Sequence, residues 1–202
     1  KMNRLIVATR NPGKIKEYKE ILQGLDVIIE TLSDFPGVRL LPEIGQTFAE
    51  NARLKAGLVA TMTDFAALGD DSGLEVDFLN GAPGVNSARF AGEPADDGRN
   101  NDKLLKLLKD VPWEQRTARF RCVVALVTSS GETYYGEGTL EGVIAFELRG
   151  DQGFGYDPLF FLPEYGKTLA ELGAEVKNKL SHRVRAVENL WPALQATFAR
   201  DS

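Results

Sequence analysis

Residues 66–84 read AALGDDSGLEVDFLNGAPG, and we expect the rest of the fold to be organised around them. This stretch sets two adjacent carboxylates, Asp70 and Asp71, directly after a short apolar segment. Adjacent like charges raise each other's proton affinity unless a cation or hydrogen-bond donors hold them, and Ser72-Gly73 adds a hydroxyl and a permissive backbone. We therefore predict a tight acidic turn here, followed by a strand at 74–79, and look to the rest of the chain for opposing charge.

The composition is that of one soluble globular domain. The chain has 202 residues, of which 43% are hydrophobic and 26% charged, so we expect a single domain over 1–202, with two lobes that share one sheet. No apolar run is long enough for a membrane span. A net charge of -5 argues against nonspecific nucleic-acid binding. With one cysteine, Cys122, and no signal-peptide pattern, we expect a cytoplasmic protein.

The first candidate site is a polar turn near the N-terminus. The apolar run at 5–8 leads into Thr9-Arg10-Asn11-Pro12-Gly13-Lys14, and apolar residues then recur at helical spacing through 15–22. A turn between a strand and a helix presents backbone N–H groups and the positive helix end, which suit phosphate. The spacing of a Walker A loop is absent. Taken alone, such a turn is more often structural than ligand-binding.

A second segment brings a lysine onto an apolar helix face. A short strand at 26–31 precedes a loop that carries Glu43, and Thr47 with Glu50 matches a capping box, so a helix starts near Thr47. Lys55 falls within the apolar stripe of this helix, with Asn51 at its margin. Lys55 either extends to solvent or reaches into a polar cleft, and the residues leave both readings open.

The middle of the chain predicts a mixed sheet. A helical pattern at 99–111 is followed by extended segments at 117–128 and 133–148, joined by a hairpin turn at 129–132. Successive strands without intervening helices are typical of antiparallel pairing, whereas the N-terminal strand–helix alternation is typical of parallel pairing. We therefore expect an α/β fold with a mixed sheet.

Two C-terminal segments carry further candidate residues. Phe154 lies between glycines and either packs in the core or stacks on a planar ligand. Further on, Lys177 precedes Ser181-His182-Arg183, where Ser181 is predicted to cap a helix. Cations in the first turn oppose the helix dipole, so they point to a bound anion there, although His182 could still be a surface residue.

These segments together indicate that the protein binds a nucleotide. Lysine and arginine would neutralise phosphates on one side, and Mg²⁺ would bridge the phosphates to carboxylates on the other, because carboxylate oxygens suit this ion. Phe154 would hold a base. The residues therefore indicate a nucleotide phosphohydrolase or phosphotransferase.

Six motifs, in this order, resemble the inosine triphosphate pyrophosphatases, the Ham1 or RdgB family, over about residues 5–194. They are Thr9-Arg10-Asn11-Pro12-Gly13-Lys14, the segment FAENARLKA at 48–56, Asp70-Asp71-Ser72-Gly73-Leu74, the pair GAPG at 81–84 and SAR at 87–89, Phe154-Gly155-Tyr156-Asp157-Pro158, and Ser181-His182-Arg183. Arg10 stands where the family often has glycine. The resemblance implies an elongated mixed sheet flanked by helices, with the active site in a cleft between two lobes, and a homodimer.

The resemblance also implies an activity and a site. The activity is Mg²⁺-dependent hydrolysis of ITP, dITP and XTP to the monophosphate and pyrophosphate, which keeps these bases out of DNA and RNA. Asp71 would be the general base, and Glu43 and Asp71 would hold Mg²⁺ with support from Asp70. The implied substrate-binding residues are Thr9, Arg10, Asn11, Pro12, Gly13, Lys14, Lys55, Ser72, Phe154, Gly155, Tyr156, Asp157, Lys177, His182 and Arg183.

Selectivity and rival functions follow from the same residues. A donor such as the Arg183 side chain would favour a 6-oxopurine over adenine, because adenine presents an amino group there. One rival is a nucleotide-binding module without chemistry, which the intact Asp70-Asp71 pair argues against. Another is a related pyrophosphatase that acts on dUTP or methylated nucleotides, and a substrate panel would separate these.

Overall fold

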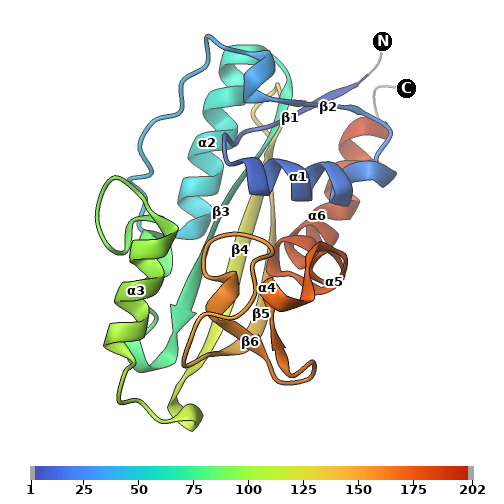
Figure 1. Cartoon of the computed structure of the whole chain (residues 1–202). Coiled ribbons are helices and arrows are strands. Elements are labelled where there is room, and N and C mark those ends of the chain that lie inside the picture. The colour runs from blue at the N-terminus through green and yellow to red at the C-terminus, as the bar shows by residue number, and fades with distance from the viewer. Residues whose placement is uncertain (1–2, 200–202) are drawn as a thin grey trace. The chain divides into compact units, whose positions relative to one another are not determined.

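The protein has an α/β fold built on a mixed β-sheet, seen in a computed structural model that describes residues 3–199 (Figure 1). Within that range the sheet has seven strands in the order β2-β1-β3-β4-β5-β6-β7. The strands are β1 (Arg4–Val7), β2 (Ile28–Thr31), β3 (Ala66–Val76), β4 (Thr117–Val127), β5 (Thr133–Ile144), β6 (Phe160–Leu162) and β7 (Lys167–Thr168). The expected mixed sheet is confirmed, since β1 pairs in parallel with β2 and β3 while β6 is antiparallel to β5 and β7.

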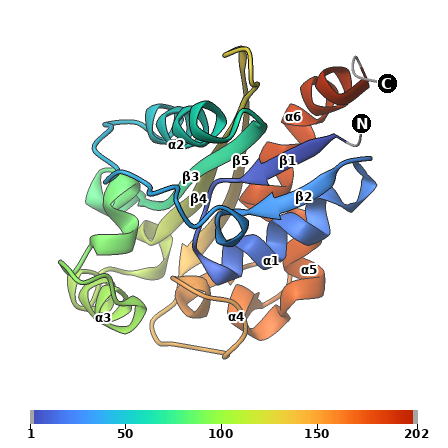
Figure 2. The same cartoon turned by 90° about the horizontal axis from the view of Figure 1, so that it is seen from above.

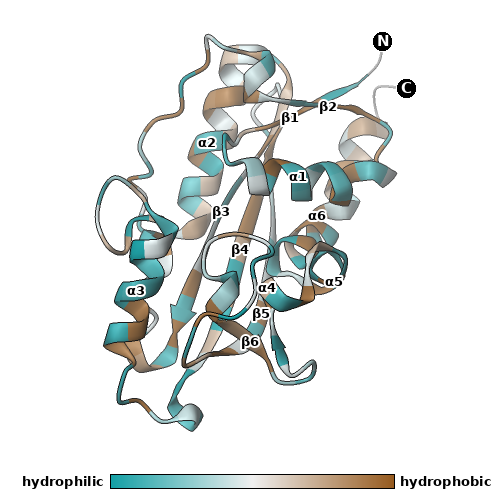
Figure 3. Ribbon diagram, viewed as in Figure 1, coloured by the Kyte–Doolittle hydropathy of each residue, from teal (hydrophilic) through white to brown (hydrophobic). Residues whose placement is uncertain are grey.

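The helices alternate with the strands in the N-terminal part and gather at the C-terminal end. They are α1 (Pro12–Ile21), α2 (Phe48–Thr63), α3 (Asp97–Leu107), α4 (Leu169–Leu172), α5 (Ala174–Leu180) and α6 (His182–Ala199). Figure 3 shows the apolar colouring along β4, whereas α1 and α3 are largely hydrophilic. Between residues 3 and 199, no helix combines the length and the apolar character needed to cross a bilayer.

The chain divides into two compact units. Among residues 3–199, the first unit comprises those up to Asp71, Cys122–Gly138 and those from Arg183 onward, and the second comprises Ser72–Arg121 and Thr139–His182. Each unit has its own apolar core. The strands β3, β4 and β5 each begin in one unit and end in the other.

In the first unit, helices cover both faces of the sheet. Figure 2 shows α2 over one face of β3, and α1 and α6 against the opposite face. Gly69 lets α2 come close, because a Cβ atom at this position would lie 2.4 Å from the carbonyl oxygen of Ala52 and 2.8 Å from the nitrogen of Ala56. Any larger residue at 69 would push α2 away from β3.

In the second unit, a buried arginine joins the end of α3 to the end of β5. Arg116 is 1% exposed, and its guanidinium donates hydrogen bonds to the backbone carbonyls of Leu108, Val111, Ile144 and Ala145. Carbonyl oxygens at the ends of helices lack intrahelical partners, and this one side chain donates to four carbonyls at or just beyond the ends of α3 and β5.

Local signals predicted several helix starts correctly. The side chain of Thr47 accepts a hydrogen bond from the Glu50 nitrogen, so α2 begins at Phe48 as expected. The side chain of Glu50 bonds to the nitrogen of Gln46 instead of completing the capping box. At the other end of the chain, α6 begins at His182, directly after Ser181.

The prediction of a tight acidic turn at 70–73 is wrong. Residues 66–76 form one continuous strand, β3, and a short 3₁₀ turn at Asp77–Leu79 replaces the end of the strand expected at 74–79. Long-range ion pairs, described below, compensate the charge of Asp70 while the segment stays in the strand. Other boundaries shift by a few residues: the helix expected at 99–111 is α3, and the strand expected to reach 148 ends at Ile144.

Candidate active site

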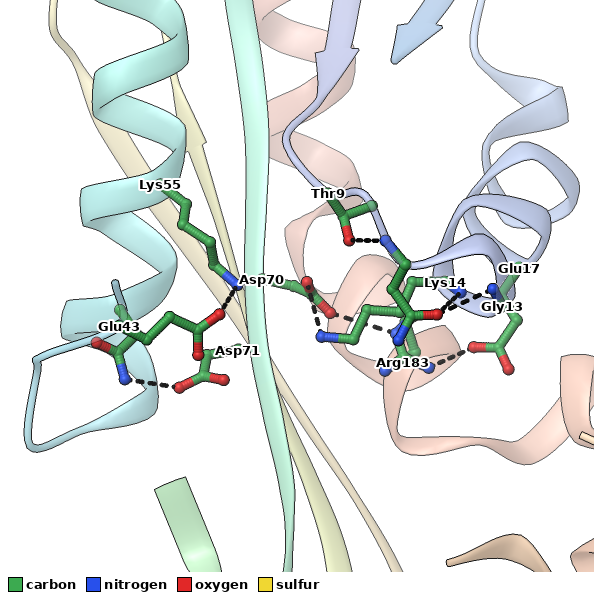
Figure 4. Close-up of polar contacts among 11 residues, drawn as sticks. Thr9, Gly13, Lys14, Glu17, Glu43, Lys55, Asp70, Asp71 and Arg183 are labelled. Carbon is green, nitrogen blue, oxygen red and sulfur yellow. Dashed lines mark hydrogen bonds and ion pairs between the residues drawn. The ribbon is translucent and has the colours of Figure 1, made fainter. Parts of the chain in front are cut away.

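The strand geometry of β3 sends Asp70 and Asp71 to opposite faces of the sheet. Successive side chains of a strand alternate between its faces, and Figure 4 shows the two carboxylates on either side of the ribbon. Both side chains are buried. They therefore have separate environments, and the mutual repulsion that we expected of an adjacent pair is relieved by geometry.

Asp70 faces two cations on the side of α1 and α6. Its Oδ1 lies 3.2 Å from Nζ of Lys14, and its Oδ2 lies 3.3 Å from Nε of Arg183. Burial alone would raise the pKa of Asp70, but the charges of Lys14, Arg183 and Lys55 outweigh burial and hold the pKa below its usual range. Asp70 is therefore a fixed anion that holds its neighbours in place.

Arg183 is itself enclosed by two carboxylates. Its side chain is 1% exposed, and its Nη1 forms an ion pair with Oε2 of Glu17 while its Nε contacts Asp70. The predicted counter-anion for this arginine is thus met by Glu17 and Asp70 within the first unit. Sequence reasoning missed Glu17, although its position three residues after Lys14 on α1 places both on one helix face.

Asp71 faces α2 on the other side of β3. Asn51 donates a hydrogen bond from Nδ2 to Oδ2 of Asp71 at 2.9 Å. Burial and the negative charge of Glu43 raise the pKa of Asp71 to about 7. A carboxyl group with this pKa exchanges a proton near neutral pH, which is what a general base requires.

Lys55 reaches into the polar cluster instead of extending to solvent. Lys55 is 8% exposed, and its Nζ lies 2.8 Å from Oε1 of Glu43. The charges of Asp70 and Glu43 raise the pKa of Lys55 against the lowering effect of burial, so this lysine stays charged. The choice that the sequence left open is settled in favour of the polar cluster.

The carboxylates fit one Mg²⁺ ion only as a partial shell. Among residues 3–199 no group of three or more His, Cys, Asp or Glu side chains forms a metal-binding cluster. Glu43 and Asp71 face the same region, since the negative charge of Glu43 raises the pKa of Asp71, whereas Asp70 lies on the opposite face of β3. Mg²⁺ commonly takes one or two carboxylates and completes its shell with water and substrate phosphate, and this pair fits that pattern.

The polar turn at 9–14 caps α1. Asn11 is the N-cap residue, and its Oδ1 accepts hydrogen bonds from the backbone nitrogens of Gly13 and Lys14. Thr9 accepts a hydrogen bond from the nitrogen of Asn11 through Oγ1, and Arg10 donates to the carbonyl of Val38. Two of the backbone N–H groups that we had assigned to phosphate are thus used by the cap itself.

The second unit gathers the remaining candidates around residues 154–157. Asp157 accepts hydrogen bonds through Oδ2 from the Phe154 nitrogen at 3.1 Å and from Lys177 Nζ at 2.7 Å. Nζ of Lys177 lies 4.3 Å from the centre of the Phe154 ring, a cation–π contact that orients the ring. The structure thus brings together Phe154, Asp157 and Lys177.

His182 is buried, so the reading as a surface residue is wrong. Its imidazole stacks on the ring of Phe120, with ring centres 4.9 Å apart and planes at 19°. Tyr156 is buried too, and its hydroxyl donates to the carbonyl of Ser87 at 2.6 Å. The predicted substrate residue Ser72 follows Asp71 on β3, where it opens the second unit.

Known proteins are similar to this chain over nearly its whole length. The Ham1 family pattern matches residues 5–193. A dITP/XTP pyrophosphatase of Listeria innocua is 53% identical over 94% of this chain and 93% of its own length, and one of Geobacter sulfurreducens is 54% identical over 92% and 94%. The solved structure of a HAM1 protein from Coxiella burnetii aligns with a TM-score of 0.87 at 40% identity, over 96% of this chain and all of that one. This chain therefore belongs to the Ham1 family.

Proposed function

We propose that this protein hydrolyses deaminated purine nucleoside triphosphates, namely ITP, dITP and XTP, to the monophosphate and pyrophosphate. The support is family membership together with relatives above 50% identity that are named dITP/XTP pyrophosphatases. Such an activity removes these nucleotides before they enter DNA or RNA.

The observation that carries the proposal is the arrangement around Asp71. A buried carboxyl group with a pKa of about 7 lies beside a second carboxylate, Glu43, and is held by the amide of Asn51. Lys55 adds a fixed positive charge at Glu43. A base, a second carboxylate and a cation in one region suit the displacement of pyrophosphate, because phosphoryl transfer depends chiefly on positioning and charge neutralisation.

In the proposed reaction, Asp71 takes a proton from the attacking water. The water oxygen bonds to the α-phosphorus, the bond from that phosphorus to the bridging oxygen breaks, and pyrophosphate leaves with the bonding electrons. Asp70, fixed by Lys14 and Arg183, holds those cations in place. We propose that Glu43 and Asp71 hold Mg²⁺, which when bound neutralises phosphate charge and lowers the pKa of a bound water.

Substrate contacts are assigned by charge and by the resemblance. We propose that Lys14, Lys55 and the turn at 9–14 bind phosphates. The nucleoside is assigned to Ser72, residues 154–157, Lys177, His182 and Arg183, with Phe154 stacking on the base. A donor toward the 6-position would favour hypoxanthine and xanthine over adenine, since a buried unpaired polar group costs about 1–3 kcal/mol.

The setting of the enzyme follows the family and the composition. We propose a homodimer that needs neither nucleic acid nor a membrane. A cytoplasmic location is supported by the lone, buried Cys122, which has no second cysteine in the sequence to pair with.

The test is a substrate panel with product identification. Purified protein should release pyrophosphate, and not orthophosphate, from ITP, dITP and XTP, with ATP and GTP much slower, and chelation of Mg²⁺ should stop the release. Binding of ITP without turnover would instead indicate a nucleotide-binding module. A preference for dUTP or methylated nucleotides would indicate the related pyrophosphatase.

A matched pair of variants isolates the proposed base. Asp71→Asn should lose turnover while its thermal unfolding stays close to that of the wild type. Glu188→Gln makes the same chemical change at an exposed position of α6, and it should leave turnover unchanged. Full activity in Asp71→Asn would remove Asp71 as the base.

A further inference from the structure

Two residues of α3 hold both backbone polar groups of one loop glycine. The nitrogen of Gly155 donates a hydrogen bond to Oδ2 of Asp97 at 2.9 Å, and its carbonyl accepts one from Nδ2 of Asn101 at 3.0 Å. Asp97 and Asn101 are four residues apart, so they lie on one face of the helix. The segment that contains them carried no motif in the sequence, and neither residue was among the predicted site residues.

The glycine they hold directly follows the proposed stacking residue, Phe154. Gly155 has a φ of 62°, a conformation in which glycine is favoured. The nitrogen of Phe154 itself is bonded to Asp157. The backbone is therefore fixed before Phe154 by Asp157 and after it by α3, which leaves the aromatic ring little freedom to move away from its place over Lys177.

The hydrogen bond from Asn101 to Gly155 comes with a loss of stability. It is only 5% exposed, and within residues 3–199 its Oδ1 is buried without a hydrogen-bond partner. An unpaired buried carbonyl oxygen is unfavourable and rare in folded proteins. Leucine, of nearly the same shape, would avoid that cost but would lose the bond to Gly155. The asparagine is explained by what its nitrogen holds.

We propose that Asp97 and Asn101 are positioning residues for the substrate base, acting through Gly155 to fix the ring of Phe154. The inference rests on the proposed function, because it assigns the base to Phe154. It places the determinant of base binding partly on α3, in residues that themselves need not touch the nucleotide. Their loss should weaken the binding of the base and leave the chemistry at phosphorus intact.

The experiment compares two triphosphates that differ only in the base. Steady-state kinetics are measured with ITP and with ribose 5-triphosphate, which has no base, for the wild type, Asn101→Leu and Asp97→Ala. For ITP we expect kcat/KM to fall about five- to tenfold, mainly through KM, as for one lost positioning hydrogen bond. For ribose 5-triphosphate it should stay within about twofold of the wild type.

Matched variants and a stability measurement exclude a structural explanation. Asp97→Asn retains an acceptor oxygen and should behave like the wild type, as should Asp102→Ala, at the exposed neighbouring position on α3. The midpoint temperature of thermal unfolding of Asn101→Leu should be unchanged or raised, because leucine lacks the unpaired Oδ1 that asparagine buries. Adding Asn101→Leu to Phe154→Ala should lower kcat/KM for ITP no further, since residues acting through one another are not additive.

The outcomes separate this inference from the function on which it rests. If the wild type does not hydrolyse ITP, the proposed function fails and this inference with it. If the wild type is active but the variants lose the same factor with both triphosphates, or lose nothing with ITP, only the positioning role is overturned. Asp97 is exposed, so Asp97→Ala tests the role even if Asn101→Leu does not fold.

Discussion

Asn51 and Asp71 form a buried hydrogen bond that links helix α2 to strand β3, with 2.9 Å between Nδ2 and Oδ2. The same asparagine accepts a hydrogen bond through Oδ1 from the nitrogen of Gly45, two residues after Glu43. One side chain thus orients the proposed base and holds the loop that carries its partner carboxylate.

Removal of Asn51 should therefore impair metal use more than folding. For Asn51→Ala we expect turnover of ITP at saturating Mg²⁺ to fall by about 10- to 100-fold, as for other groups that orient metal ligands. The measurement is pyrophosphate release over a Mg²⁺ titration, and the midpoint should move to higher concentration. Gln195→Ala, an exposed amide on α6, serves as the control, and an unchanged Asn51→Ala would contradict the role.

Binding of Mg²⁺ should depend on pH through Asp71. Because the metal-free group has a pKa of about 7, binding below that pH must displace a proton, and affinity should rise as pH increases to about 7 and then level off. Titration calorimetry in buffers of different ionisation enthalpy should detect about one proton released near pH 6 and almost none near pH 8. Equal release at both pH values would contradict this prediction.

The same group sets a stability trend in the metal-free protein. The pKa of Asp71 in the folded state is about 7, well above the usual value for an aspartate, so the folded state retains a proton that the unfolded chain has released. The contribution of Asp71 is therefore complete at low pH and is lost as pH rises through about 7. Urea unfolding at a series of pH values gives the free energy of unfolding for the wild type and for Asp71→Asn. The wild-type value should fall relative to that of Asp71→Asn as pH rises toward 7, and parallel pH curves for the two proteins would contradict this prediction.

The carboxylate of Glu17, paired with a buried arginine, should contribute far more to stability than that of Glu30, paired with an exposed arginine. Glu17→Gln leaves the buried guanidinium of Arg183 with less compensation, and loss of one partner of a buried pair costs about 3–5 kcal/mol. Glu30→Gln makes the same change in the pair with Arg4, whose side chain is 43% exposed, and should cost at most about 1 kcal/mol. Urea unfolding measures both, and equal losses would contradict the buried role.

Two glycine-to-alanine substitutions should change the stability of the fold in opposite directions. Gly69→Ala places a methyl group against the backbone of α2 and should destabilise the protein by about 1–3 kcal/mol. Gly57 lies within α2, and an added Cβ there meets nothing within 4 Å, so Gly57→Ala should stabilise by about 0.5–1 kcal/mol. Thermal unfolding distinguishes them, and activity should fall only in Gly69→Ala.

Local sequence patterns predicted most of the helices and strands of the fold. The N-cap residue of α2, Thr47, lies three residues from its partner Glu50, and the strand–turn–helix at the N-terminus is read from one short window. The parallel and antiparallel parts of the sheet follow from whether a helix separates the strands. Interactions of this range are visible in a single sequence.

The acidic stretch shows where local reasoning fails. Asp, Ser and Gly favour turns and are depleted in strands, so residues 70–73 suggested a turn. In the folded protein Asp70 is paired with Lys14, 56 positions away, and with Arg183, 113 positions away. Such distant partners override local preference, and no window of sequence contains them.

The residues missed in the site have the same physical origin. Glu17 balances the charge of Arg183, 166 positions along the chain, while Asp97 and Asn101 bind the backbone of Gly155. Contacts to backbone atoms leave no trace in the type of the residue that is contacted. Candidate chemistry was therefore visible in the sequence, but its supports were not.

The ion pair between Lys55 and Glu43 joins a proposed phosphate-binding cation to a proposed metal-binding carboxylate. A cation that arrives at Glu43 competes with Lys55, and an anion that arrives at Lys55 competes with Glu43. By thermodynamic linkage, each ligand should then raise the affinity for the other by the same factor. We expect free Mg²⁺ and free phosphate to bind weakly on their own, and the metal–triphosphate complex to bind cooperatively because it satisfies both partners at once.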